Sequence, residues 1–182
     1  MRLLTASALV LAAVSAWSPV ASSGSSAHVE RRAALEANVV HEINRVRVAH
    51  ALRPLRVSPS LRTAARGHTH AMIAHGFFGH DSLDGTAFSV RIKRHYTSRG
   101  WATWSVGEAL LSTSGMRIVR PTVVVDAWLR SPSHREIVLS PAWRDVGIGV
   151  LYAPTAPGAF EGAEAVVVTA DFGLRDGRAD LP

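Results

Sequence analysis

The spacing of apolar residues changes once along this chain, and the change limits the folds open to it. Between residues 32 and 49, and again between residues 60 and 75, apolar residues recur every three or four positions, which predicts two amphipathic helices. Near the end, residues 145–152 and 163–172 alternate, which predicts two half-buried strands that pair antiparallel. Helical segments first and strands last predict an α+β layered domain.

Glycine, proline and serine mark where these elements begin and end. Ser60 is a suitable N-cap for the second helix, and Gly76 can end that helix in the left-handed conformation. Residues 101–106 are expected to form a strand, between a short helix capped by Thr86 and a fourth helix that begins at Pro121.

The first 23 residues have the features of a secretory signal peptide. Arg2 gives a positive start, residues 3–13 form a short apolar run, and small residues follow. The run is shorter than the roughly 20 apolar residues of a transmembrane helix, and a retained N-terminal membrane anchor is the alternative. We therefore expect four segments: a signal peptide over 1–23, a flexible linker over 24–31, the folded domain over 32–175 and a C-terminal tail over 176–182.

Composition allows one packed domain. At 182 residues, 47% of them hydrophobic, the chain is long enough for a single core. It has no cysteine, so an exported form must be held together by packing and not by disulfides. Its net charge is +6, but no basic run is longer than two residues, so we expect no nucleic-acid partner. We also expect a monomer with no membrane span once the signal peptide is removed.

Two histidines and a glutamate are the candidate site residues: His80, Glu108 and His134. Each lies close to a glycine or proline turn signal, which would place it at the rim of a cleft and outside regular structure. Glu108 lies between a strand end and an apolar run, so its carboxylate is expected to be partly buried and to need a partner. A short helix capped by Ser131 or Ser133 is also predicted to run through His134 to Leu139. Two imidazoles and a carboxylate are a ligand set that Zn²⁺ accepts with a fourth position open. His68, in contrast, lies on the apolar face of the second helix and is expected to be a core residue with its nitrogens hydrogen-bonded. The triplet Asp-Phe-Gly over residues 171–173 is interpreted as the end of a strand.

Short motifs in a fixed order surround these residues. They are Asn-Arg-Val-Arg at 44–47, Ala-x-x-His-x-x-x-Met at 65–72, Gly-Phe-Phe-Gly-His at 76–80, Gly-Glu at 107–108, Ala-Trp-Leu-Arg-Ser-Pro-Ser-His-Arg at 127–135, Val-Gly-Ile-Gly-Val at 146–150 and Thr-Ala-Asp-Phe-Gly at 169–173. In this order and spacing, over residues 35–173, the chain resembles the CAP superfamily (cysteine-rich secretory proteins, antigen 5 and pathogenesis-related proteins). This domain is also called the SCP domain, and the resemblance is to its bacterial, cysteine-free branch.

The resemblance implies a three-layer α-β-α sandwich around a small central antiparallel sheet. It also implies a secreted protein that acts mainly by binding a small apolar ligand, a cell-envelope component or a protein partner. His80, Glu108 and His134 would be the cavity residues, with a divalent metal such as zinc bound between them. The chain departs from the family pattern at Ala109 and Ile137, where asparagines are common, and it lacks the second glutamate of eukaryotic members.

Two other interpretations stay open at this point. One is a metal-dependent hydrolase or protease, in which Glu108 is the general base for a water held by His80 and His134. If Glu108 is itself a metal ligand, no obvious base is left, and this favours binding over catalysis. The other is a purely structural role, in which the three side chains form a hydrogen-bonded cluster that fixes a helix to a loop.

Overall fold

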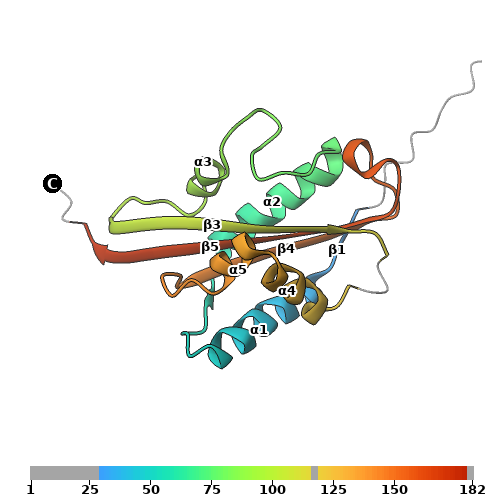
Figure 1. Ribbon diagram of the computed structural model, residues 1–182. Coiled ribbons are helices and arrows are strands. Elements are labelled where there is room, and N and C mark those ends of the chain that lie inside the picture. Colours follow the sequence, from blue (N-terminus) through green and yellow to red (C-terminus); the bar gives the residue numbers. More distant parts are fainter. Residues whose placement is uncertain (1–28, 116–118, 180–182) are drawn as a thin grey trace, which may run out of the picture.

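A computed structural model of the protein describes residues 29–115 and 119–179, so the expected signal peptide lies outside the described residues. The elements, in chain order (Figure 1), are β1 (Glu30–Arg31), α1 (Ala33–Ala49), β2 (Arg56–Val57), α2 (Pro59–His75), α3 (Phe88–Lys93), β3 (Trp101–Thr113), α4 (Pro121–Arg130), α5 (Pro132–Val138), β4 (Asp145–Ala153), the 3-10 helix η2 (Gly158–Phe160) and β5 (Ala165–Arg178).

The strands form one sheet in the order β1-β4-β5-β3, with β2 paired to β4 outside this path. The pairs β1–β4, β4–β5 and β3–β5 are antiparallel, and β2 runs parallel to β4. Helices α2 and α3 lie on one face of the sheet, while α1, α4 and α5 lie on the other (Figure 1). The predicted three-layer α-β-α sandwich with a small, mainly antiparallel sheet is therefore confirmed.

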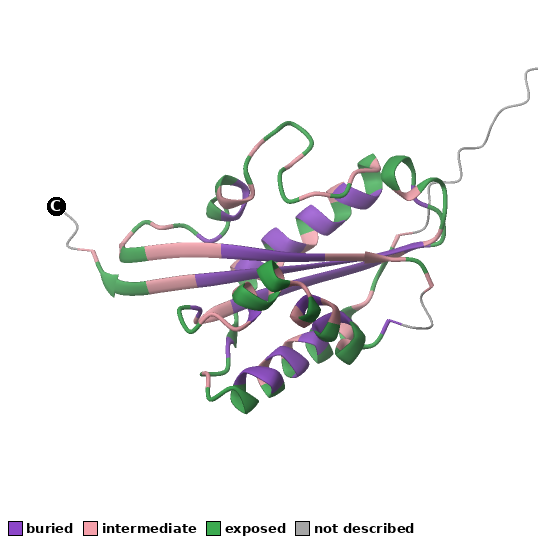
Figure 2. Cartoon of the chain, viewed as in Figure 1, coloured by how far each residue is buried: buried purple, intermediate pink, exposed green. Residues whose placement is uncertain are grey.

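Both faces of the central strands are buried (Figure 2). Val166, Val167 and Val168 follow one another in β5 and are all fully buried, although successive side chains point to opposite faces. The prediction of half-buried strands is therefore wrong for this part of the sheet. Helices cover each face, so apolar side chains are needed at consecutive positions of a central strand.

Two glycines allow α2 to lie close against β4. A Cβ atom at Gly147 would lie 2.1 Å from the backbone of Leu61, and one at Gly149 would lie 2.7 Å from the backbone of Ala65. Both distances are too short for a side chain, so the glycines of the 146–150 motif are needed for this contact. The contact fixes α2, the helix from which the loop bearing His80 leaves.

Three element boundaries differ from the predicted ones. Strand β3 continues to Thr113, well past the predicted end at residue 106, because it pairs with β5 along its length. Strand β5 continues to Arg178, so the expected C-terminal tail begins inside a strand. Residues 30–31, expected in the flexible linker, pair with β4 as β1.

The ends of α2 are set by local backbone chemistry. Pro59 takes the first helical position, and the Ser58 side chain accepts the amide of Leu61 at 3.3 Å, so Ser58 is the N-cap in place of the predicted Ser60. Gly76 ends the helix with φ of 65°, as predicted. Within the part of the chain that the structure describes, no helix has both the length and the apolar character needed to cross a bilayer.

Candidate functional site

Glu108 lies at the centre of the candidate site, inside β3. Its side chain is fully buried, and the residue opposite it in the strand pair is Asp171 of β5. One carboxylate oxygen accepts a hydrogen bond from Nδ1 of His80 at 2.8 Å, and the other pairs with Arg91 of α3. The expectation that Glu108 lies outside regular structure at the rim of a cleft is therefore wrong, because β3 is longer than predicted.

The two partners keep Glu108 ionised. Burial alone would raise the pKa of this carboxyl group, since charge is poorly solvated inside a protein. The hydrogen bond from His80 and the charge of Arg91 outweigh burial and hold the pKa of Glu108 below its usual value. An ionised carboxylate can only accept hydrogen bonds, so Nδ1 of His80 carries the proton in this pair.

His80 lies in the loop between α2 and α3, where the sequence predicted an irregular segment. Its side chain is 48% exposed, so one edge of the ring contacts Glu108 while another part of it faces solvent. The hydrogen bond to Glu108 raises the pKa of His80 above its usual value. Because Nδ1 is held by Glu108, Nε2 is the ring atom left for a ligand.

His134 lies in the short helix α5, which agrees with the predicted helix through Leu139 and not with a position outside regular structure. Its ring centroid is 6.4 Å from that of His80, so the two imidazoles are neighbours. Burial and the nearby His80 lower the pKa of His134, so the two rings are shifted in opposite directions. The structure thus brings His80 next to both Glu108 and His134, with His80 in the middle.

Two residues of this cluster were missed by the sequence analysis. Arg91 of α3 is almost fully buried and lies between two carboxylates, bonded to Glu108 and 3.9 Å from Asp171. Asp171 is fully buried, and burial together with the neighbouring Glu108 raises the pKa of Asp171 well above its usual value. The sequence did contain a signal for Asp171, because a carboxylate within an apolar strand segment is expected to be buried and to need a partner. It carried none for Arg91.

His68 of α2 contacts the loop that bears His80. It is buried as predicted, and its Nε2 donates to the carbonyl oxygen of Gly79, one residue before His80, at 2.8 Å. Phe77 packs against its ring edge-to-face, with ring centroids 5.9 Å apart. The expectation that both nitrogens are hydrogen-bonded is not met, since Nδ1 has no partner among the described residues. His68 therefore ties α2 to the loop that presents His80.

The arrangement does not offer a complete metal-ligand set of three side chains. Both oxygens of Glu108 are engaged by His80 and Arg91, so ligation by Glu108 would break one of those contacts. No group of three or more histidine or acidic side chains in the described ranges 29–115 and 119–179 is suited to hold a metal ion. Two adjacent imidazoles, His80 and His134, are what this cluster leaves open to a cation.

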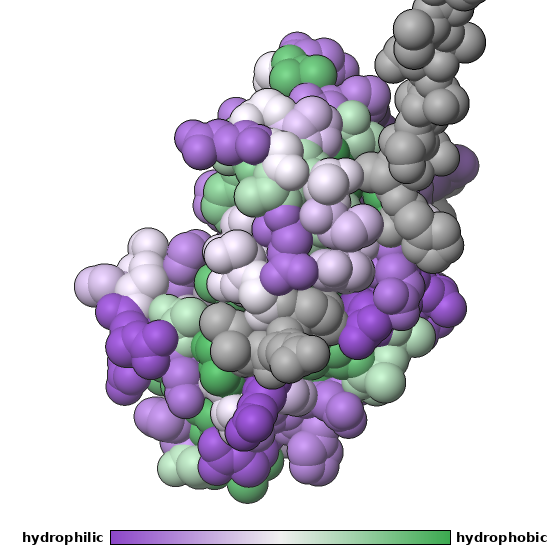
Figure 3. Space-filling model, turned by 90° about the vertical axis from the view of Figure 1, so that its right-hand side faces the viewer, coloured by the Kyte–Doolittle hydropathy of each residue, from purple (hydrophilic) through white to green (hydrophobic). Residues whose placement is uncertain are grey.

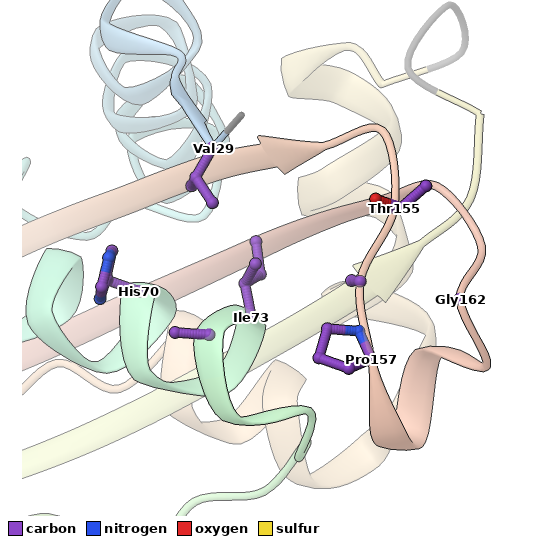
Figure 4. A pocket seen from close by; sticks show the side chains of 8 residues that line it. Val29, His70, Ile73, Thr155, Pro157 and Gly162 are labelled. Carbon is purple, nitrogen blue, oxygen red and sulfur yellow. The ribbon is translucent and has the colours of Figure 1, made fainter. Parts of the chain in front are cut away.

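A separate hollow of about 550 Å³ lies beside the C-terminal turns of α2, next to the loop between β4 and β5. Figure 4 shows Ile73 of α2 between Val29 and Pro157, with His70 further along the helix. Figure 3 faces this end of the molecule, and on it hydrophobic residues form small areas among polar ones. None of the residues that line this hollow belongs to the His80 cluster, so an apolar ligand here would bind apart from it.

Comparison with known proteins identifies the family. Residues 40–172 match the cysteine-rich secretory protein family, CAP. Uncharacterized protein YkwD of Bacillus subtilis (strain 168) is 30% identical over 117 residues, a match that spans 64% of this chain and 42% of that relative's length.

Two solved structures have a similar fold at low sequence identity. An outer surface protein from Borrelia burgdorferi superimposes with a TM-score of 0.63 and 23% identity, over 82% of this chain and 99% of that one. An extracellular protein containing a SCP domain from Bacillus anthracis str. Ames gives a TM-score of 0.60 and 20% identity, over 79% of this chain and 41% of that one. These similarities show a shared fold, and the match over residues 40–172 shows that this cysteine-free chain belongs to the CAP family of cysteine-rich secretory proteins.

Proposed function

We propose that this protein acts by binding, and that His80 and His134 form its recognition site. The observation that carries the proposal is the fully buried Glu108, whose two oxygens are bonded to His80 and Arg91. This support fixes the ring of His80, leaves Nε2 as its open ring atom, and sets the ring centroid 6.4 Å from that of His134. A preoriented side chain loses little freedom when a ligand binds, which favours affinity.

A divalent metal such as zinc is the cofactor that these residues suit best. His80 and His134 would hold it through ring nitrogens, and Glu108 would orient His80 from behind, as carboxylates commonly do for metal-binding histidines. Two protein ligands alone bind zinc weakly. The remaining positions would therefore be filled by water or by donor atoms of the recognised molecule, for which the metal would supply positive charge.

The recognised molecule is proposed to be a cell-envelope component, a small apolar ligand or a protein partner, met outside the cell by a monomeric protein. The extracellular and outer-surface descriptions of the two structural relatives support export. The predicted signal peptide over residues 1–23 supports it independently. The hollow beside α2 is a place where an apolar ligand could bind without disturbing His80.

Hydrolysis with Glu108 as general base is not favoured by this geometry. A general base must reach the proton that it removes, whereas the Glu108 side chain is fully buried with both oxygens bonded. In a hydrolase built on this site, His80 would have to be the base and Glu108 its orienting partner. No observation on the described residues favours that function over binding.

Zinc titration of the purified protein by calorimetry, at about pH 7.5, tests the proposal. We expect one bound ion per chain, abolished by His80→Ala or His134→Ala. Glu108→Gln should weaken zinc by about 10–100-fold, as loss of an orienting partner does. His41→Ala, which removes an exposed histidine from α1, is the control and should bind zinc normally.

Two results would overturn the proposal. The first is zinc binding that survives both His80→Ala and His134→Ala, because the ion would then lie elsewhere. The second is hydrolysis of ester or peptide substrates that disappears with His80→Ala, because the site would then be catalytic. Circular dichroism on each variant separates loss of binding from loss of folding.

A further inference from the structure

A second pocket, of about 450 Å³, is lined by residues from the start of β3 and the end of β5. Figure 1 shows that these two strand ends lie side by side. Its lining includes four arginines and a tryptophan: Arg53, Arg56, Arg144, Arg175 and Trp101. Trp101 precedes Glu108 by seven residues in β3, which is about 24 Å along an extended strand. The pocket is therefore distinct from the His80 site and shares no residue with it.

Positive charge in this pocket exceeds negative charge. Arg56 is paired with Asp145 at 3.0 Å, and Asp176 also lines the pocket. Asp145 also accepts a hydrogen bond from the Tyr96 hydroxyl at 2.8 Å, so its carboxylate is shared between Arg56 and Tyr96. With four arginines set against these two aspartates, two positive charges stay unbalanced by carboxylates of the described residues.

The side chain of Arg175, which carries one of these charges, is held in place by aromatic rings. Its guanidinium lies 3.6 Å from the centre of the Tyr96 ring and 5.9 Å from that of Trp101. Stacking on aromatic rings fixes the plane of the guanidinium but leaves its hydrogen-bond donors unused. Nε and Nη2 of Arg175 are buried and have no acceptor among the described residues.

Arg144 is fixed differently and also keeps its charge. Its Nη1 donates to the carbonyl oxygens of Pro141, Ala142 and Trp143 at 2.9, 2.9 and 3.1 Å. Backbone carbonyls orient the side chain without neutralising it. Two of the arginines are thus held in place before any ligand arrives, which reduces the entropy lost on binding.

A further cation lies behind the pocket. Arg47 is fully buried, and it donates to the carbonyl oxygen of Arg53 at 3.0 Å and to that of Val138 at 2.8 Å. It forms no ion pair with a carboxylate of residues 29–115 and 119–179. Buried charges act through a medium that screens them little, so Arg47 adds to the positive potential at this end of the molecule.

We propose that this arginine pocket binds a phosphate group of a phosphate-bearing ligand. A phosphate monoester carries about −1.5 to −2 charges at neutral pH, which matches the two unbalanced arginines. Its oxygens accept the paired hydrogen bonds that guanidinium groups donate. Trp101 supplies an apolar wall for the carbon skeleton that carries the phosphate. A free phosphate monoester and the phosphomonoester headgroup of a phosphatidic acid share this chemistry.

Titration of the purified full chain with sn-glycerol 3-phosphate, by calorimetry at low ionic strength, tests the proposal. Arg53→Gln should weaken binding by about tenfold, the loss expected for one charge-assisted hydrogen bond. Arg53 is exposed and its side chain forms no ion pair within the described part of the chain, so this variant should fold normally. Arg175→Gln should weaken binding at least as much. Arg130→Gln, which removes an exposed charge from α4, should bind like the wild type.

A vesicle arm identifies the source of the phosphate. Binding to vesicles that contain phosphatidic acid, but not to phosphatidylcholine vesicles, that is stronger than binding to glycerol 3-phosphate would indicate a lipid headgroup. Stronger binding to the free ester would indicate a soluble ligand. The proposal is overturned if the wild type binds neither probe, or if Arg130→Gln weakens binding as much as Arg53→Gln, because net charge and not the pocket would then account for affinity.

Discussion

The side chain of Glu108 has no contact with solvent, so its charge must be balanced by neighbouring side chains. His80 and Arg91 provide this balance from two different segments. The glutamate therefore has two effects at once. It holds the short helix α3 against β3 through Arg91, and it orients the exposed ring of His80.

Replacing Glu108 with glutamine should lower the free energy of unfolding by about 3 kcal/mol, near the lower end of the range for breaking a buried ion pair. Arg91 would lose its closest carboxylate and keep only Asp171, 3.9 Å away. Urea denaturation measures the loss. Glu136→Gln, on the exposed face of α5, is the control and should lie within about 0.5 kcal/mol of the wild type. A Glu108→Gln protein as stable as the wild type would contradict the assigned ion pair.

The pair between His80 and Glu108 should make stability depend on pH. Folding raises the pKa of His80 above its unfolded value of about 6.5. The stability that the imidazolium contributes is therefore fully present below about pH 6.5 and is lost as pH rises through the higher folded pKa. Glu108 stays ionised at that pH because its own pKa is lowered.

His80→Asn tests this dependence, because an amide still donates to Glu108 but does not titrate. The difference in unfolding free energy between wild type and His80→Asn should be larger at about pH 6 than at about pH 9. His41→Asn on α1 is the matched control. A difference that grows as pH rises would mean that folding lowers the pKa of His80, opposite to the assignment.

At the scale of elements, the packing of α2 on β4 decides where the loop bearing His80 begins. The helix rests on the glycines of β4, whose missing side chains leave room for its backbone. His68 then fixes the following loop through Gly79. The packing of α2 on β4 and the hydrogen bond from His68 to Gly79 therefore together set the position of His80.

Gly147→Ala should destabilise the domain by about 3 kcal/mol, because the new methyl group would lie 2.1 Å from the backbone of α2 and the helix would have to move. Gly67→Ala is the matched control within α2. No atom lies within 4 Å of the added methyl there, and alanine favours a helix over glycine, so stability should rise by up to about 1 kcal/mol. Thermal unfolding of both variants measures the contrast. Equal effects would show that α2 does not depend on the glycines.

At the scale of the whole molecule, two helical layers enclose a sheet and leave distinct binding regions on it. The histidines lie where α5 and the α2–α3 loop meet β3, which is the last strand in the order of the sheet. The arginine pocket lies at one end of the strands. A single packed core thus supports two sites of different chemistry.

Export is the prediction that concerns the whole chain. The apolar run over residues 3–13 and the small residues after it predict a mature protein that starts between residues 17 and 30. N-terminal sequencing of protein recovered outside the producing cell measures the start. Intact Met1 on a pool that stays inside the cell would contradict export.

The sequence by itself determined the order of the helices and of the three long strands, the end of α2 at Gly76 and the identity of His80, Glu108 and His134 as candidates. These features depend on local backbone chemistry and on short motifs, so they can be read from neighbouring residues. Only the tertiary structure decided the role of Glu108, because that role depends on Arg91, 17 residues away, and His80, 28 residues away. The tertiary structure also decided the environment of Asp171. Its neighbour Glu108 belongs to another strand, and the two carboxylates meet only because β3 pairs with β5. The interaction between two charged side chains depends on the distance between them in the folded protein, and this distance cannot be read from their positions in the sequence.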